Sequence, residues 1–384
     1  MRPTIALSIN TTWNIVNFRT GLIKRLQDAG YEVVAIAPAD AAVARLRALG
    51  VRHVPIAIDN MGSSALRDLV LLKDYWRILH RLKPAAFLGW TVKPNVYGSL
   101  AAQMLGIPVI NNVSGLGTAF IKRGPLTAIV SSLYRLAFSR SATVFFQNDE
   151  DRQLFVRQRL VPAEKAKLLP GSGIDLAAFI PDEAARPVGR PFMFLLVARL
   201  LRDKGVGEYA AAAAIVRATC PDVRFALLGF LDVANRTAIS REEVEAWTAA
   251  GTIDYLGHAE DVRPAMRAAD CIVLPSYREG MPRTLLEGAA LGKPLIATDV
   301  PGCREIARNG VNALTCKVAD AQSLAGAMLD MLRMPEEERR RLGRAGRRIA
   351  EEEFDEWIVS DRYLTAVSDA LRHKPSDRQM PGRR

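Results

Sequence analysis

Two glutamates, Glu279 and Glu287, flank the start of an expected helix in the second half of the sequence. The apolar run Cys271–Pro275 is typical of a buried strand, and it leads through a short loop and Pro282 into that helix. Free amides in the first helical turn, at residues 283–285, and the positive end of the helix dipole favour a bound phosphate. A carboxylate beside a phosphate accepts hydrogen bonds from sugar hydroxyls. The pattern indicates a ligand carrying both groups; the alternative is a capping loop with one surface glutamate.

A second pair of charged residues follows another expected strand. Arg199 and Lys204 follow the apolar run Phe192–Val197 and lie in the loop before the next expected helix. Ligands of an open α/β sheet bind at the carboxyl ends of its strands, where Arg and Lys neutralise a diphosphate. Alone, the pair is more typical of a solvated loop. It gains weight because the loop of Glu279 is expected to end at the same edge of the same sheet.

The sequence shows no ligand set for a metal or a dinucleotide. Its four histidines have no metal-ligand spacing, its four cysteines form no C-x-x-C pair, and neither G-x-G-x-x-G nor a Walker A segment is present. We therefore predict no metal and no resident cofactor. His258 follows a strand and either lines a ligand edge or is a loop histidine without a role.

Strand-length apolar runs alternate with helical stretches, as parallel α/β proteins require. One series extends over residues 4–169 and a second over residues 192–316, and the charged, proline-containing stretch between them is typical of a linker. The expected fold class is α/β, with two doubly wound, Rossmann-like domains. The expected divisions are residues 1–180 as a first domain, 181–191 as a linker, 192–353 as a second domain, 354–373 as a C-terminal helix and 374–384 as a disordered tail.

The positive charge of the chain is concentrated in its first half. The net charge of the 384 residues is +11; residues 1–180 hold 22 Lys and Arg against 11 Asp and Glu, whereas residues 181–384 hold 30 of each. No acidic residue stands between Asp74 and Asp149. This field attracts nucleic acid, an anionic bilayer or a phosphorylated substrate; the alternative is a solvated basic face.

Two stretches in this basic half, residues 63–83 and 118–140, mix apolar and aromatic side chains with Lys and Arg. That composition is typical of an interfacial helix, and equally of domain helices whose apolar faces belong to the core. No signal-peptide pattern begins the sequence, and its longest apolar run, Tyr209–Val216, is far shorter than the ~20 residues of a spanning helix. We expect a cytoplasmic protein without a membrane span.

Taken together, these motifs resemble the retaining glycosyltransferases of family four, which have the two-domain GT-B fold. The resemblance implies that the two domains face a cleft and that the C-terminal helices cross back to the first domain. The resemblance extends over nearly all of the chain up to the tail. Its most specific part is the combination of Arg199 to Gly205, Leu274 to Glu279 with Glu287, and Pro301 to Glu305. Within the family the chain is most similar to bacterial enzymes that add galactose or N-acetylgalactosamine to an undecaprenyl-diphosphate-linked sugar. The motifs that carry the resemblance are Asn17-Phe18-Arg19, Val113-Ser-Gly-Leu-Gly117, Pro170-Gly-Ser-Gly-Ile-Asp175, Ala198-Arg199 with Lys204-Gly205, Leu274-Pro-Ser-Tyr-Arg-Glu279-Gly with Glu287, and Pro301-Gly-Cys-Arg-Glu305.

The resemblance implies a UDP-hexose or UDP-N-acetylhexosamine donor in the second domain. There Glu287 would hold the ribose hydroxyls, Arg199 and Lys204 the diphosphate, and Glu279 the sugar and distal phosphate. The remaining donor-binding residues implied are Gly280, Met281, Arg283, Thr284, Leu285 and His258. The anomeric configuration would be retained without a required metal, by front-face attack in which the leaving phosphate helps to deprotonate the acceptor.

The first domain would bind a polyprenyl-diphosphate-linked saccharide acceptor, and its expected contacts are Phe18, Arg19, Ser114 and Lys122. Two features depart from the family. Asn112, Val113 and Ser114 stand where many members carry a histidine, and the glycine pair after the first strand is missing. We expect a peripheral enzyme on the inner face of the cell membrane, bound to an anionic membrane surface and not to nucleic acid.

Two other functions compete with this one. The first is an enzyme of the same fold that uses a soluble acceptor or epimerises a nucleotide sugar at carbon 2. The second is a non-catalytic polyanion-binding protein, which would show strongly salt-dependent binding to any duplex and no dependence on Glu279.

Overall fold

The computed structural model describes residues 2–59, 64–115, 125–182, 189–232, 235 and 237–372, with the side chains of residues 125–127 left out. The chain divides into two compact units. The first holds residues up to Ser172 together with the helix from Trp357 onward, and the second holds Gly173–Glu356. Each unit is built around one parallel sheet.

The sheet of the first unit has seven parallel strands in the order β3-β2-β1-β4-β5-β6-β7, so the order reverses between β1 and β4. The strands inside the sheet are buried along nearly their whole length because helices cover both faces, whereas the two edge strands are partly exposed. The strands are β1 Thr4–Ser8, β2 Glu32–Ala37, β3 Arg52–Pro55, β4 Ala86–Trp90, β5 Val109–Val113, β6 Thr143–Phe146 and β7 Ala166–Leu168.

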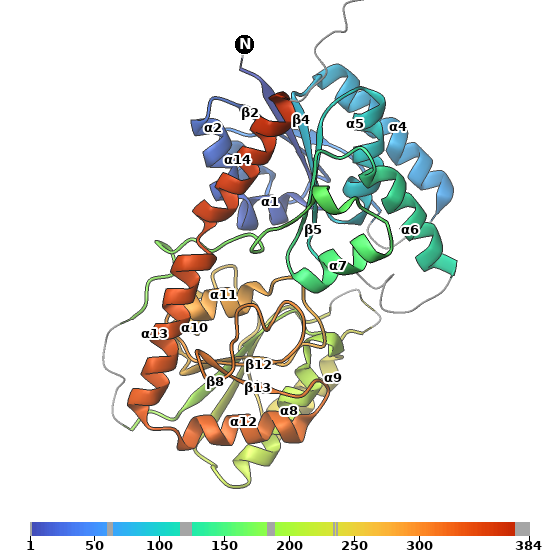
Figure 1. Ribbon diagram of the computed structural model, residues 1–384. Helices are drawn as coiled ribbons and strands as arrows, with labels where there is room; N and C mark the ends of the chain where they lie inside the picture. The colour runs from blue at the N-terminus through green and yellow to red at the C-terminus, as the bar shows by residue number, and fades with distance from the viewer. Residues whose placement is uncertain are drawn as a thin grey trace, which may run out of the picture. The chain divides into compact units, whose positions relative to one another are not determined.

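Each face of this sheet has its own helices and its own apolar core. Helices α1, α2 and α14 lie on one side of the sheet, and α4, α5 and α6 lie on the other (Figure 1). Buried side chains of α1, α2, α3 and α14 form one core, and those of α4, α5, α6 and α7 belong to the cores of the other face. The helices are α1 Thr12–Phe18, α2 Thr20–Asp28, α3 Val43–Ala48, α4 Ala65–Leu82, the π-helical turn η1 Pro94–Gly98, α5 Ser99–Met104, α6 Pro125–Phe138, α7 Asp149–Arg157, the short η3 Ala163–Lys165 and α14 Glu356–Arg372. Of the C-terminal helices expected to cross back, α14 packs with the first unit, whereas the helix over residues 336–353 belongs to the second.

The second unit repeats the architecture with six strands in the order β10-β9-β8-β11-β12-β13. Helices α10, α11 and α13 bury side chains on one face, and α8, α9 and α12 do so on the other. The strands are β8 Met193–Val197, β9 Arg224–Leu228, β10 Asp254–Tyr255, β11 Cys271–Leu274, β12 Leu295–Thr298 and β13 Ala313–Cys316. The helices are η4 Arg202–Lys204, α8 Val206–Arg217, α9 Arg241–Ala249, α10 Arg263–Ala268, α11 Arg283–Ala290, α12 Ala321–Arg333 and α13 Glu336–Glu353.

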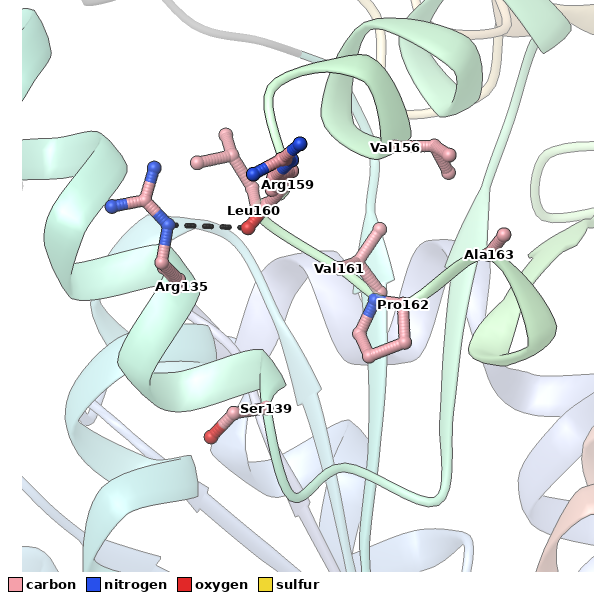
Figure 2. A pocket seen from close by; sticks show the side chains of 8 residues that line it. All are labelled: Arg135, Ser139, Val156, Arg159, Leu160, Val161, Pro162 and Ala163. Carbon is pink, nitrogen blue, oxygen red and sulfur yellow. Dashed lines mark hydrogen bonds between the residues drawn. The ribbon is translucent and has the colours of Figure 1, made fainter.

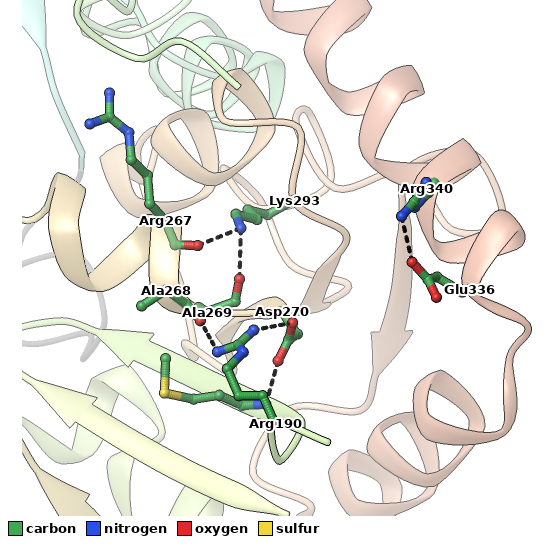
Figure 3. A network of polar contacts seen from close by, with 9 residues as sticks. Arg190, Arg267, Ala268, Ala269, Asp270, Lys293, Glu336 and Arg340 are labelled. Carbon is green, nitrogen blue, oxygen red and sulfur yellow. Dashed lines mark hydrogen bonds and ion pairs between the residues drawn. The ribbon is translucent and has the colours of Figure 1, made fainter. Parts of the chain in front are cut away.

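A network of polar contacts links the amino ends of β8 and β11. Asp270 accepts hydrogen bonds from the backbone N–H of Met193 at 2.8 Å and from Arg190 at 2.6 Å (Figure 3). Lys293 donates to the carbonyls of Arg267 and Ala269 at 2.7 and 2.8 Å. These bonds fix the two central strands at the end opposite to the loops of Arg199 and Glu279.

The units divide at Ser172, whereas the sequence placed the end of the first domain at residue 180. The difference has a packing reason: Ile174 and Phe179 are buried in the core of the second unit, and Ile174 forms a bridge with Asp355. The proposed tail, residues 374–384, and residues 183–188 of the proposed linker lie outside the described residues. In the described part of the chain, no helix is both long and apolar enough to cross a bilayer.

Candidate active site

The loops of Arg199 and Glu279 leave neighbouring strands at the carboxyl edge of the second sheet. Strands β8 and β11 pair in parallel, with Phe194 opposite Cys271, and the strand order reverses between them. A crevice at such a reversal is where open α/β sheets bind ligands. The structure brings Lys204 and Glu279 together here, since the Lys204 ammonium forms an ion pair with the Glu279 carboxylate.

Backbone contacts hold the two loops against each other. The N–H of Tyr277 donates to the carbonyl of Asp203 at 2.9 Å. Gly205 has a φ of +70°, and a β-carbon there would lie 2.2 Å from the carbonyl oxygen of Pro275. Only glycine combines that backbone conformation with that close approach. The short turn between Lys204 and helix α8 is therefore fixed relative to the Glu279 loop.

Glu279 is held from two sides in a half-buried position. Besides Lys204, the Ser276 hydroxyl donates to the same carboxylate oxygen at 2.7 Å. The Arg199 side chain differs: it is exposed, and it makes no hydrogen bond or ion pair with any described residue. Its charge is available to an anion, whereas that of Lys204 is partly balanced by Glu279.

Glu287 lies inside helix α11 and is 8% exposed. Burial raises the pKa of its carboxyl group, and the neighbouring Arg283 guanidinium opposes that shift. The Arg283 Nε donates to the Glu287 carboxylate at 3.2 Å. The carboxylate is thus paired within its own helix, which begins directly after the Glu279 loop.

The structure corrects part of the expected donor contacts at the start of α11. The N–H of Leu285 donates to the carbonyl of Pro282 at 3.2 Å, so this amide is used inside the helix. The first turn of α11 is tight and has i→i+3 hydrogen bonding, so the Leu285 amide is not free to bind a phosphate. The Thr284 hydroxyl donates to the carbonyl of Val197 at 2.7 Å and anchors α11 to the end of β8. The Leu285 side chain is fully buried in the core.

The other predicted donor residues lie on the loops around this edge. Gly280 and the half-buried Met281 stand between Glu279 and α11, and Met281 packs against the core. His258 is exposed and stacks on Phe230, with ring centroids 4.7 Å apart and planes 24° apart. Sequence reasoning missed Phe230, which is 47% exposed just beyond β9. Its position after a strand was the available signal, and an exposed flat ring pair is a surface on which a base stacks.

Of the predicted acceptor residues of the first unit, Arg19 is buried, whereas Phe18 and Ser114 are half-buried. Phe18 contacts Trp13 edge to face, with ring centroids 5.3 Å apart. Arg19 is 7% exposed, donates to the carbonyl of Phe18 and lies 5.2 Å from the ring of Trp90. Lys122 lies outside the described residues.

Ser114 belongs to a buried polar network that reaches the C-terminal helix. Its hydroxyl donates to the Asn112 side-chain oxygen at 3.0 Å, and the Asn112 side-chain nitrogen donates to the Tyr363 hydroxyl at 2.8 Å. Tyr363 also packs on Trp90, with ring centroids 5.5 Å apart. Burial raises the pKa of Tyr363 to about 12, so its hydroxyl stays neutral. Tyr363 and Asn112, both missed by the sequence analysis of the site, connect the surroundings of Arg19 and Ser114.

Two surface pockets of the first unit contain none of the predicted site residues. One, of about 330 Å³, lies between α6 and the segment from Val156 to Ala163, where Arg135 donates to the carbonyl of Arg159 (Figure 2). The other, of about 590 Å³, is lined by residues that follow β2, β3 and β4 and by the first half of α4. No group of three or more metal-ligating side chains occurs among the residues that the structure describes.

Two family descriptions match the chain, one in each unit. Residues 16–171 match the Glycosyl transferase 4-like domain, and residues 182–349 match Glycosyl transferases group 1. Among solved structures, a glycosyltransferase from Rickettsia africae has a TM-score of 0.78 at 16% identity, over 97% of this chain and 99% of that chain. Anabaena Alr3699/HepE in complex with UDP and glucose has a TM-score of 0.77 at 18% identity, over 96% of this chain and 100% of that chain.

Two curated relatives are similar over most of the chain. The N,N'-diacetylbacillosaminyl-diphospho-undecaprenol alpha-1,3-N-acetylgalactosaminyltransferase of Campylobacter jejuni is 29% identical over 379 residues, which are 94% of this chain and 97% of that protein. The UDP-Gal:alpha-D-GlcNAc-diphosphoundecaprenol alpha-1,3-galactosyltransferase of Escherichia coli is 24% identical over 277 residues, 69% of this chain and 71% of that protein.

The fold and the two family matches define an enzyme of the GT-B class. More particularly, the chain belongs to the family-four-like glycosyltransferases, with a 4-like first unit and a group 1 second unit. The predicted fold class and the predicted family resemblance are confirmed. The alternative of a non-catalytic polyanion-binding protein is set aside.

Proposed function

We propose that the enzyme transfers a hexose or N-acetylhexosamine from a UDP-sugar to a polyprenyl-diphosphate-linked saccharide, with retention of configuration. Similarity to the two undecaprenol-linked transferases supports the substrate classes. The observation that supports the donor half is the ion pair of Lys204 with Glu279 at the strand-order reversal of the second sheet, with Glu287 in helix α11, which follows the Glu279 loop.

The donor residues have separable roles in this proposal. Glu287 accepts hydrogen bonds from the ribose hydroxyls, since a carboxylate has only acceptor atoms. Arg199 and Lys204 neutralise the diphosphate, and a phosphate oxygen competes with Glu279 for the Lys204 ammonium. As the bond from the sugar to the diphosphate breaks, negative charge builds on the phosphate oxygen, and fixed cations there stabilise the transition state.

The acceptor hydroxyl forms the new glycosidic bond on the face that UDP leaves. Its proton passes to the departing phosphate oxygen, so the step balances without a protein base. No metal takes part in this scheme. Arg199 and Lys204, both on the loop after β8, supply the charge stabilisation that a metal ion provides in other transferases.

The acceptor half rests on the first unit. The pocket of about 590 Å³ has apolar walls, among them Leu66 and Val70 of α4, and a polar end where Lys93 pairs with Asp68 at 2.8 Å. Tyr97 donates to the other oxygen of Asp68 at 2.9 Å. Apolar surface beside a small polar group fits a saccharide or the first isoprene units of its carrier.

An anionic membrane surface is the second proposed partner of this unit. On α4, Leu66, Leu69 and Val70 are 78%, 62% and 57% exposed, and Trp76 is 37% exposed. The exposed cations Lys73, Arg77 and Arg81 share the helix. Apolar side chains flanked by cations are typical of a helix that lies in a bilayer interface. We infer a peripheral location on the inner membrane face, where nucleotide sugars are available.

A transfer assay with two acceptors tests the proposal. Purified enzyme is incubated with labelled UDP-sugars and either a polyprenyl-diphosphate saccharide or the same saccharide without its lipid. Transfer to the lipid-linked acceptor alone supports the proposal, whereas equal transfer to both favours a soluble-acceptor enzyme. An epimerised nucleotide sugar with neither acceptor present would contradict it.

A further inference from the structure

The Arg283 guanidinium contacts both Glu287, the carboxylate proposed to bind the ribose, and the backbone of Gly173 at the start of the second unit. Its Nε donates to Glu287 at 3.2 Å, and its Nη1 donates to the carbonyl oxygen of Gly173 at 2.9 Å. The side chains of Arg283 and Glu287 are 24% and 10% exposed. Both bonds direct the guanidinium toward the protein, although Arg283 is the first residue of the helix that faces the proposed diphosphate.

The carbonyl that holds Arg283 belongs to a fixed piece of backbone. Ile174 forms a parallel bridge with Asp355, its N–H donates to the carbonyl of Phe354 at 2.8 Å, and its carbonyl accepts from Glu356 at 3.1 Å. Gly173 has a φ of +71°, and a β-carbon there would lie 2.5 Å from the Cα of Glu356. The guanidinium is therefore restrained at a second point that does not depend on Glu287.

The charge of Arg283 matters because Glu287 is buried. Removing a carboxylate from water favours its neutral form, and burial raises the pKa of Glu287. Arg283 opposes the shift, while Asp261 adds to it from the loop before α10; Asp261 is itself paired with Arg263 at 2.8 Å. A neutral carboxyl group donates a proton where the ribose hydroxyls also donate, so nucleotide recognition needs the ionised form.

We propose that Arg283 is a positioning residue for the nucleotide, which holds the Glu287 carboxylate ionised and correctly turned toward the ribose and does not itself bind the diphosphate. The inference rests on the proposed function and names the contact through which Arg283 serves it. The Gly173 carbonyl keeps the guanidinium on Glu287 when an anion occupies the start of the helix.

The test compares UDP with an analogue whose ribose lacks both hydroxyls, by calorimetry from mildly acidic to mildly alkaline pH. In Arg283→Met we expect UDP affinity to fall about tenfold, the effect of one hydrogen bond to a charged group. The loss should deepen as pH falls, because Glu287 without its cation protonates at higher pH. Affinity for the analogue should not change. Arg283→Lys, which keeps the charge, should restore the weak pH dependence of the parent.

Arg340→Met provides a matched control. Arg340 pairs with Glu336 at 2.6 Å with the same four-residue spacing, on the exposed surface of α13 (Figure 3). This variant should bind both ligands like the parent at every pH. If Arg283→Met lowers the affinities for UDP and for the analogue equally at all pH values, the inference is overturned, because that result indicates a diphosphate contact or a damaged fold. Unchanged UDP binding in that variant would also overturn it. If the parent protein itself does not bind UDP, the proposed function fails instead.

Discussion

The carboxyl edges of the two sheets carry different chemistry. In the second unit the edge holds the ion pairs Lys204–Glu279 and Arg283–Glu287, with Arg199 exposed beside them. In the first unit the amide of Asn112 and the hydroxyls of Ser114 and Tyr363 form a buried network of neutral groups, with the buried Arg19 as the charged group beside it.

The contrast matches two kinds of ligand. A diphosphate is recognised by charge, and the Glu279 carboxylate holds the Lys204 ammonium in place when the site is empty. A saccharide is recognised by neutral donors and acceptors whose geometry must be fixed, and burial of amides in a satisfied network fixes it. A substitution at one of these edges should therefore affect only the matching ligand.

The largest expected effect comes from the cations of the second unit. Arg199→Ala and Lys204→Ala should each lower kcat by about two orders of magnitude, because a fixed charge on a developing anion is worth about 3 kcal/mol. Initial transfer rates measure this, and thermal unfolding should change little. Arg202→Ala is the control, since Arg202 lies in the same short helix as Lys204 but its guanidinium pairs with Glu243 at 3.0 Å. Parent-like turnover in both site variants would contradict the assignment.

Charge reversal on α4 should abolish membrane binding and leave nucleotide binding intact. Replacing Lys73, Arg77 and Arg81 by Glu should abolish sedimentation with anionic vesicles, since each cation contributes about 1 kcal/mol near such a surface. UDP binding should be unchanged. In the parent, high salt should weaken vesicle binding because the Debye length falls to about 3 Å at 1 M.

The control reverses Arg340, Arg341 and Arg344 on α13, which are exposed in the second unit. This variant should still bind vesicles. If the α4 variant sediments as the parent does, the exposed apolar residues of α4 serve another purpose.

The two glutamates of the second unit should differ in what they affect. Glu287→Ala should weaken UDP binding about tenfold or more, whereas Glu279→Gln should chiefly slow transfer, because a lost bond to a charged group costs about 1.5–3 kcal/mol. Calorimetry and initial rates distinguish the two. The proposed difference in role is wrong if both substitutions change only UDP affinity, or if neither changes UDP affinity or the transfer rate.

A smaller effect is expected from Tyr363→Phe, which removes one buried hydrogen bond from the neutral network of the first unit. We expect a stability loss of about 1 kcal/mol and a several-fold rise in the acceptor KM with the donor KM unchanged. Tyr75→Phe is the matched control, because Tyr75 is also buried in this unit and bonds to Ser8 at 2.8 Å. Equal changes in both KM values would show that the network does not serve the acceptor alone.

The smallest effect is expected from removing divalent metal. A chelator should leave the transfer rate nearly unchanged, because the cations of the second unit balance the leaving diphosphate in the proposed scheme. Rates before and after dialysis against the chelator test this. Complete loss of activity that magnesium or manganese restores would show that the charge balance at this edge needs an ion.

The sequence by itself determined the architecture and the location of the charged edge. Buried strands and helix starts depend on neighbours within a few residues, so alternating apolar runs placed the loops of Arg199 and Glu279 after strands. Parallel pairing then forced both loops to one edge. The concentration of positive charge in the first half was likewise readable from residue counts.

Only the tertiary structure decided which partners the side chains of these residues take. Arg283 bonds to a carbonyl 110 residues away, and Asn112 meets a hydroxyl 251 residues away on α14. The amide of Leu285, expected to face a phosphate, is used by the first turn of its own helix. Long polar side chains reach several positions with similar local energy, so packing of distant segments selects among them, and no local pattern records that selection.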